Sequence, residues 1–166
     1  MAAAGGEAGL GWLGFALATV VTWGLYGVLL HQGQVAMGDP ANGRYKAFLF
    51  VGVAYVLAAV LAPLAMLVMA RASMTFPSGG VLWSLLAGLA GAAGAFTVLL
   101  AFGARGSPSV VMSIVFAGAP IVNAVTTLWL KRGAGVTIRW PFLLGIVMAA
   151  LGGFLVTMFR PDAVPK

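Results

Sequence analysis

The sequence predicts an all-α integral membrane protein, built as one domain that is a bundle of five transmembrane helices. Two features of the composition predict this fold class: 62% of the 166 residues are hydrophobic, and only 7% are charged. The mean hydropathy of +1.08 agrees with them, because a soluble domain carries about 25% charged residues and could not bury so much apolar surface. We therefore expect a multi-pass protein of the cell (inner) membrane, in contact with the lipid bilayer.

Five apolar runs set the positions of the expected helices. About 20 helical residues cross the ~30 Å hydrocarbon layer at about 1.5 Å per residue, and no run has an acid, a lysine or an arginine in its interior. Strands of a barrel would alternate strictly between apolar and polar residues, and nothing in the chain alternates. The single domain, residues 1–166, is therefore expected to hold helices at about 10–30, 47–70, 81–102, 108–130 and 140–159.

The boundaries of the runs agree with helix ends. The first run could be mistaken for a signal peptide, but it lacks a positively charged start and stays apolar as far as Leu30, which is too long. Pro77, Pro108 and Pro141 stand where a proline before a helix or in its first turn is tolerated. The breaks between the runs hold nearly every charge and supply glycine and proline; they read "HQGQVAMGDPANGRYK", "RASMTFPSGG", "GARGSPS" and "KRGAGVTIR".

The basic residues stand in these breaks. The formal net charge is +6, but the scattered bases are typical of loops at lipid headgroups, so we expect no nucleic-acid partner. Lysine and arginine divide almost evenly between the two sides: four lie in the 71–80 and 131–139 loops, and five in the 31–46 loop, the 103–107 loop and the C-terminal tail. Either one strong loop decides the orientation, or copies insert both ways and pair as an antiparallel dimer.

One face of the fourth run combines polar residues with a proline. The residues recur at helical spacings of three and four: Ser109, Ser113, Phe116, Pro120, Asn123 and Thr127. Pro120 cannot donate to the carbonyl of Phe116, and in hydrocarbon a free carbonyl is tolerated only against protein or water. We therefore expect the face to point inward, with Ser113, Pro120 and Asn123 along a solute pathway. The alternative is that the polar side chains only join helices through hydrogen bonds.

Aromatic residues of the first two runs are further candidates for the pathway. Trp23 and Tyr26 fall near the middle of the first run, although Trp and Tyr usually anchor helices at the membrane surface. They could stack on a ring or a cation of a substrate, and Tyr55 of the second run joins them as a candidate. His31 ends the first run and is a candidate proton-handling or polar group, because imidazole titrates near neutral pH. A plain interfacial histidine is the alternative.

Small residues in the third and fifth runs indicate close helix packing. The third run contains "AGLAGAAGA", and the fifth has Gly145, Ala149 and Gly153 at four-residue spacing. Small residues at such spacing let helix backbones approach closely, within one chain or between two. The fifth helix is therefore a candidate dimer face.

Residue types that catalysis and metal binding require are scarce. The chain has no cysteine and one histidine, and its three acids, Glu7, Asp39 and Asp162, lie outside the apolar runs. No intramembrane carboxylate can exchange a proton for a cation, and no Ser/His/Asp set or metal-ligand set is available. We expect no enzymatic activity, no metal and no cofactor.

Three features of the chain form a pattern: "TWGLYGVLLHQ" with its Trp23-Gly24 pair, a small-residue third run that leads through a short turn into a fourth run with Pro120, and the closing "FLLGIVMAALGGFLV". In these features, and across essentially its full length, the chain resembles one EamA-like repeat of the drug/metabolite transporter superfamily. The family often ends its fourth helix with Gly-Glu, whereas this chain reads "WLKRGAG". The resemblance implies export or exchange of small metabolites or drugs through two inverted five-helix repeats, with the site between the halves.

These observations predict a small-solute transporter subunit that works by alternating access. The subunit would act as a homodimer, antiparallel where copies insert both ways, or together with a second five-helix half. Without a buried acid, a neutral or anionic solute or simple facilitation is expected rather than proton–cation exchange. One alternative is a non-transporting scaffold or accessory subunit of a larger complex. Another is a flippase for lipids or lipid-linked sugars, which differs only in its substrate.

Overall fold

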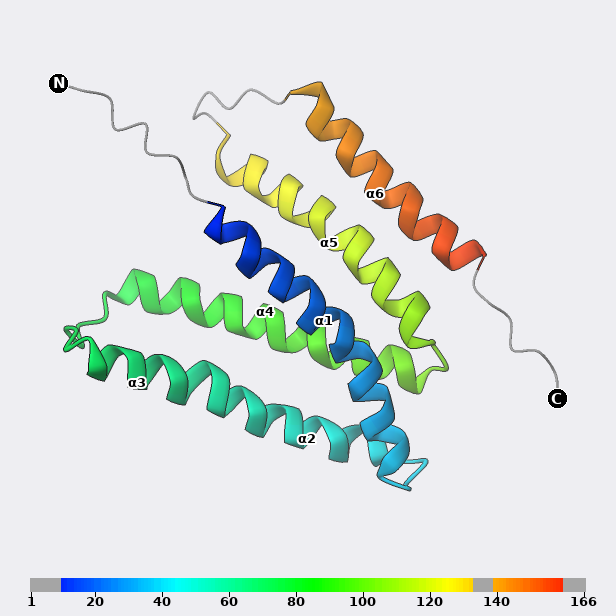
Figure 1. Ribbon diagram of the computed structural model, residues 1–166, viewed down its shortest axis with the longest axis horizontal. Helices are drawn as coiled ribbons and strands as arrows, with labels where there is room; N and C mark the ends of the chain where they lie inside the picture. Colours follow the sequence, from blue (N-terminus) through cyan, green and yellow to red (C-terminus); the bar gives the residue numbers. More distant parts are fainter. Residues whose placement is uncertain (1–9, 133–138, 160–166) are drawn as a thin grey trace.

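The computed structural model describes residues 10–132 and 139–159, where every regular element is a helix (Figure 1). In chain order the elements are α1 (Gly11–Ala36), α2 (Gly43–Val56), a short π-helix (Leu57–Leu61), α3 (Ala62–Met69), α4 (Ser78–Gly103), α5 (Pro108–Leu130) and α6 (Trp140–Met158). The π-helix joins α2 and α3 into one span, Gly43–Met69. The described residues thus contain five helices long and apolar enough to cross a membrane, which confirms the predicted all-helical class with five long apolar helices.

The helix ends differ most from the apolar runs around the first loop. The run 10–30 continues as α1 to Ala36, because the polar residues that follow the run do not break a helix. The chain then turns at Gly38, whose φ of +63° is a conformation that favours glycine. α2 begins at Gly43, before the apolar residues from 47 onward. An apolar run marks the part of a helix that can lie in hydrocarbon. The helix itself continues until a residue that ends helices is reached, so its bounds can extend beyond the run.

A wide turn interrupts the second span just before a proline. Over Leu57–Leu61 the backbone is a π-helix, and the N–H of Ala62 donates to the carbonyl of Leu57, five residues earlier. Pro63 has no N–H, and its ring would clash with the carbonyl four residues earlier in a regular helix. Widening one turn accommodates the ring without ending the helix. The proline at position 120 behaves differently, since α5 is assigned as a regular α-helix on both sides of it.

The helices form two groups that diverge toward one end of the molecule (Figure 1). α2, α3 and α4 make one group, and α1, α5 and α6 make the other. Within the described residues α2 packs against α1 and α4, while α3 packs against none of the other helices and α6 only against α5. The two groups are therefore held together at the end where α2 begins and stand apart at the end where α3 stops.

The core lies where the two groups meet. It consists of five buried side chains from three helices: Leu30, Val98, Leu99, Phe102 and Met112. Gly27 of α1 lets α5 approach, because a Cβ at this position would lie 2.6 Å from Cγ of Met112. Most other large apolar side chains are exposed on the isolated chain, including Leu89 at 67% and Met148 at 63%. Exposure of that extent suits a surface covered by lipid or by a partner rather than by water.

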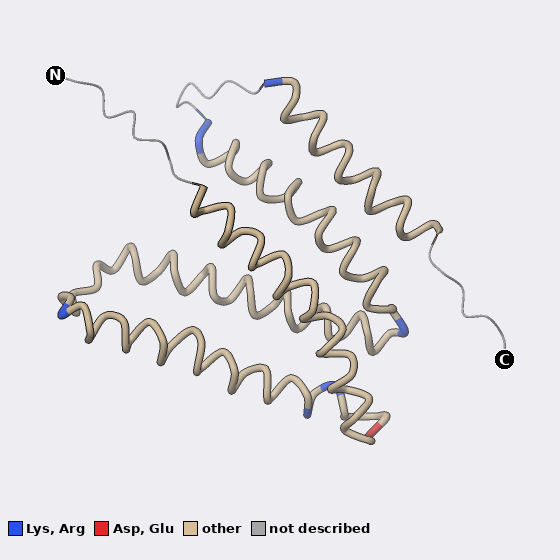
Figure 2. Tube along the Cα trace, viewed as in Figure 1, with Lys and Arg blue, Asp and Glu red and all other residues tan. Residues whose placement is uncertain are grey.

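Charged residues occupy the ends of the helices and leave their lengths free. Figure 2 shows lysine and arginine only at the loops and helix termini of the described chain, with Asp39 as the acid in this part. The loop between α1 and α2 and the loop between α4 and α5 lie at one end, and the loop between α3 and α4 lies at the other (Figure 1). Glu7 and Asp162 lie outside the described residues. The loops thus divide between two ends as the sequence predicts.

Candidate functional site

A cleft lies between α1, α4 and α5, on the inner side of the two diverging groups. Its volume is about 460 Å³, which is within the range of small-ligand sites. Gly91 and Gly94 leave its α4 wall bare, since a Cβ at either position would meet no atom within 4 Å. Trp23 of α1 and Phe116 of α5 supply its aromatic surface. The polar side chains on its lining are Thr19 and Thr97.

Trp23 and Tyr26 are neighbours on α1 but face different spaces. Their ring centroids are 5.6 Å apart, and the rings are tilted by 50°. Trp23 lines the α1–α4–α5 cleft, whereas Tyr26 lines a second pocket of about 440 Å³ between α1 and α2. Tyr55 of α2 is 41% exposed and lines neither space. The structure thus places Trp23 and Tyr26 on different spaces, and a shared pathway of the three aromatic residues stays a prediction.

The polar face of α5 is only partly covered by the rest of the chain. Phe116 lines the cleft, and Ser113 is half-buried, with its hydroxyl donating to the carbonyl of Ser109 over 2.7 Å. Pro120 and Asn123 are exposed and do not line the cleft. The expected inward direction of this face is thus not achieved by one chain alone, and the role of the face in a pathway stays a prediction.

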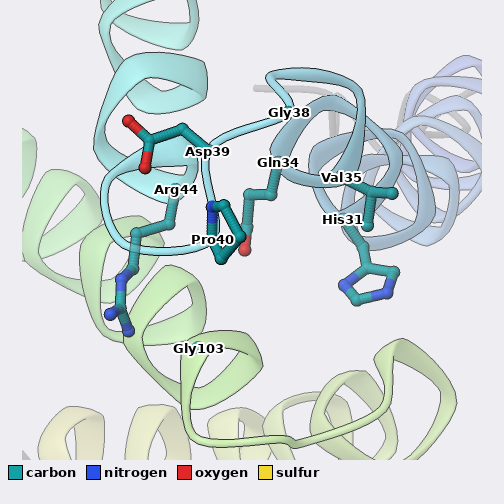
Figure 3. Close-up of a pocket in the computed structure, with 8 residues that line it drawn as sticks. All are labelled: His31, Gln34, Val35, Gly38, Asp39, Pro40, Arg44 and Gly103. Atoms are coloured by element: carbon teal, nitrogen blue, oxygen red, sulfur yellow. The ribbon is translucent and has the colours of Figure 1, made fainter.

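A more polar pocket lies at the joined end of the molecule. It has a volume of about 370 Å³ and is lined by the end of α1, the following loop, the start of α2 and the last residue of α4. Figure 3 shows its lining residues: His31, Gln34, Val35, Gly38, Asp39, Pro40, Arg44 and Gly103. His31, the predicted polar handle, therefore lies here and not in the α1–α4–α5 cleft.

The carboxylate of Asp39 has three hydrogen-bond partners, two in its own loop and one on α2. It accepts hydrogen bonds from the backbone N–H groups of Ala41 and Asn42, at 3.1 and 2.9 Å, and pairs with Nζ of Lys46 at 2.7 Å. The hydrogen bond from Lys46, followed by that from Asn42, lowers the pKa of Asp39 to about 2. In Figure 3 the carboxylate points away from His31 and the end of α4. The loop acid thus fixes the start of α2, and the ammonium group of Lys46 offsets its negative charge.

Arg44 is the basic side chain that lines the pocket. Its guanidinium lies against Gly103, where a Cβ would overlap it, so the missing side chain of that glycine makes room for the cation. The guanidinium carbon lies 5.3 Å from the centroid of the Tyr45 ring, and one terminal nitrogen donates to the carbonyl of Ala41 at 3.5 Å. Within the described residues no carboxylate pairs with Arg44.

Two further polar groups in this pocket lack partners. Nδ1 of His31 and Nε2 of Gln34 are buried, and neither has a hydrogen-bond partner in the described part of the chain. The His31 ring is held edge-on against Phe102, with centroids 5.7 Å apart. Buried polar atoms are satisfied in most proteins, so two orphans beside one arginine call for an explanation.

Sequence reasoning identified His31 but missed Gln34, Arg44 and Gly103. A signal was present, because "HQGQ" and "GRYK" flank one short loop and each carries polar groups next to an apolar run. The contribution of Gly103, about 60 residues further along, depends on packing between helices and left no local mark.

Comparisons of the chain with protein-family models, with curated proteins and with solved structures each give no match.

Proposed function

We propose that the chain is an integral protein of the cell (inner) membrane and one half of a small-solute transporter of the drug/metabolite transporter type. The single observation that carries the transport proposal is the α1–α4–α5 cleft, which lies where the two helix groups diverge. Five spans of 19 to 27 residues with mean hydropathies of 1.8 to 2.4 support the membrane assignment. The residue pattern that resembles an EamA-like repeat supports the transporter class.

The cleft favours a substrate with apolar or aromatic character. Trp23 and Phe116 face it from different helices, and its threonine hydroxyls bond to their own helix, Thr19 to the carbonyl of Phe15 and Thr97 to that of Gly94. The indole N–H of Trp23 is then the side-chain donor on the lining that has no partner in the described residues, so the cleft binds through contact area more than through hydrogen bonds. No acid lies in the described helices, so a neutral or anionic solute, or facilitated passage, fits better than proton–cation exchange.

A second half is needed to complete the pathway. Pro120 and Asn123 are exposed beside the cleft, and α3 packs against no other helix in the described residues. A second copy, or another five-helix half, that covered these surfaces would enclose the polar face of α5 and bury the free carbonyl that Pro120 leaves. Rocking of one half against the other would then open the cleft to alternate sides.

Cysteine accessibility tests this proposal directly, because the chain has no cysteine of its own. We expect Phe116→Cys and Asn123→Cys, in membrane vesicles, to react with a membrane-impermeant maleimide. The matched control is Met148→Cys, on the outer side of α6, which should stay unlabelled because its surroundings are lipid. Sealed positions 116 and 123, in a protein that inserts normally, would instead support the scaffold alternative.

A further inference from the structure

The polar pocket at the joined end of the molecule contains an arginine and two buried side-chain nitrogens that lack partners. Arg44 has no carboxylate partner in the described residues. The carboxylate of Asp39, which also lines the pocket, already accepts three hydrogen bonds. The neighbouring His31 and Gln34 each bring a buried nitrogen without a partner. A space that offers a guanidinium and two further nitrogens, with its one acid paired to Lys46, is complementary to an anion.

The fold keeps this arrangement open by several independent contacts. Gly103 at the end of α4 leaves room for the guanidinium, and the Tyr45 ring supports it. Phe102 holds the His31 ring edge-on from the same end of α4. In Figure 3 His31 and Arg44 descend from different helices toward the end of α4, with Gln34 between them. The donors are thus presented by a built pocket and not by loose surface side chains.

The size of the pocket suits a ligand larger than water. Its volume of about 370 Å³ far exceeds the ~30 Å³ that one water molecule occupies in the liquid. The planar fork of an arginine matches the paired oxygens of a carboxylate or a phosphate.

We propose that His31, Gln34 and Arg44 form an anion-binding site for an oxyanion of the phosphate or carboxylate class, distinct from the α1–α4–α5 cleft. Arg44 supplies the charge, Nε2 of Gln34 supplies a directed hydrogen bond, and Nδ1 of His31 supplies another when it carries a proton. The oxyanion belongs either to a small molecule in solution or to the headgroup of an anionic lipid, because the pocket lies at the ends of the helices. The site does not depend on transport through the cleft.

The single histidine of the chain makes the site observable. We expect inorganic phosphate to shift the ¹⁵N resonances of the His31 imidazole in protein held in a neutral detergent at fixed pH, while sodium chloride of equal ionic strength does not. In a parallel arm, nanodiscs of phosphatidylcholine are compared with nanodiscs that contain phosphatidylglycerol. A shift with phosphate alone identifies a soluble anion, and a shift with phosphatidylglycerol alone identifies a lipid headgroup.

Variants show whether the shift arises in this pocket. Arg44→Gln should weaken the apparent affinity for phosphate roughly tenfold or more, because charge-assisted hydrogen bonds are lost. Arg105→Gln should not weaken it, because Arg105 lies in the loop between α4 and α5 and outside the pocket lining. Gly103→Ala should displace the guanidinium without changing the charge of the protein, and it serves as the second variant if Arg44→Gln fails to fold. Its control is Gly88→Ala, where a Cβ meets no atom within 4 Å. No shift in either arm, or equal shifts in Arg44→Gln and wild type, would overturn the proposal.

Discussion

At the scale of single residues, two charged side chains near the loop between α1 and α2 differ in their contacts. Asp39 is surrounded by donors from its own loop, and Arg44, five positions later, is directed toward the end of another helix. The difference follows from reach, because a short carboxylate finds backbone N–H groups two and three residues on, whereas a long guanidinium passes beyond them. The Asp39 carboxylate therefore already has partners close by in the chain, whereas the Arg44 guanidinium is available to a ligand.

The hydrogen bonds of Asp39 predict its titration. Its pKa of about 2 lies below the ordinary value of about 3.9, so the carboxylate favours the folded loop above about pH 4, and this contribution is lost as the pH falls through about 2. We expect Lys46→Met to raise the pKa toward the ordinary value, because the largest cause of the lowering is removed. The measurement is a ¹³C titration of labelled aspartate, in which Asp39→Asn identifies the resonance. A titration midpoint that Lys46→Met leaves unchanged would contradict the ion pair.

At the scale of elements, the fifth apolar helix packs through one of its small residues. A Cβ at Gly153 of α6 would overlap the Cβ of Ala117 on α5 and would lie 3.3 Å from the carbonyl of Ser113, whereas a Cβ at Gly145 meets no atom within 4 Å. The close approach predicted for this helix thus occurs within the chain at Gly153, and Gly145 remains free for another contact.

This difference predicts opposite effects of the same substitution at two sites. We expect Gly153→Ala to destabilise the protein by about 1–3 kcal/mol, because the added methyl group forces α6 away from α5. Gly145→Ala should be neutral or stabilising by up to about 1 kcal/mol, since alanine favours a helix more than glycine does. Thermal unfolding in detergent measures both. Equal destabilisation by the two variants would show that Gly145 is also packed, for example against a second copy.

The helices themselves could be read from the sequence, and the details that depend on neighbours could not. Charge is excluded from oil, so five uncharged apolar runs were enough to predict five helices. The wide turn before Pro63 was missed, although a proline inside an apolar run is itself a signal of a disturbed helix. The polar pocket was missed for a different reason: Arg44 and Gly103 meet only where α2 packs against α4. Of the predicted pathway residues, Trp23 lines the cleft, while Asn123 is exposed on the single chain.

At the scale of the whole molecule, the two ends carry similar positive charge. Arg71 lies in the loop between α3 and α4, and Arg105 lies in the loop between α4 and α5, at the opposite end. Retention of basic loops in the cytoplasm sets orientation, so a near balance leaves the direction of insertion sensitive to single charges.

The balance predicts that orientation can be shifted both ways. With reporter fusions at the C-terminus, one active on each side of the membrane, we expect signal from both sides for the wild type. Arg71→Gln and Arg105→Gln should shift the ratio of the two signals in opposite directions, so each variant serves as the control for the other. One orientation that neither substitution changes would exclude the antiparallel pair.

The wide turn at Leu57–Leu61 leaves a backbone carbonyl oxygen without a hydrogen-bond donor. Because Pro63 brings no N–H, the turn has at least one more acceptor oxygen than it has donors, in a helix segment that no described neighbour covers. Hydrocarbon offers no hydrogen to such an oxygen. We therefore expect the missing donor to come from outside the protomer. A partner that supplied it would contact the chain at this stretch of the second span.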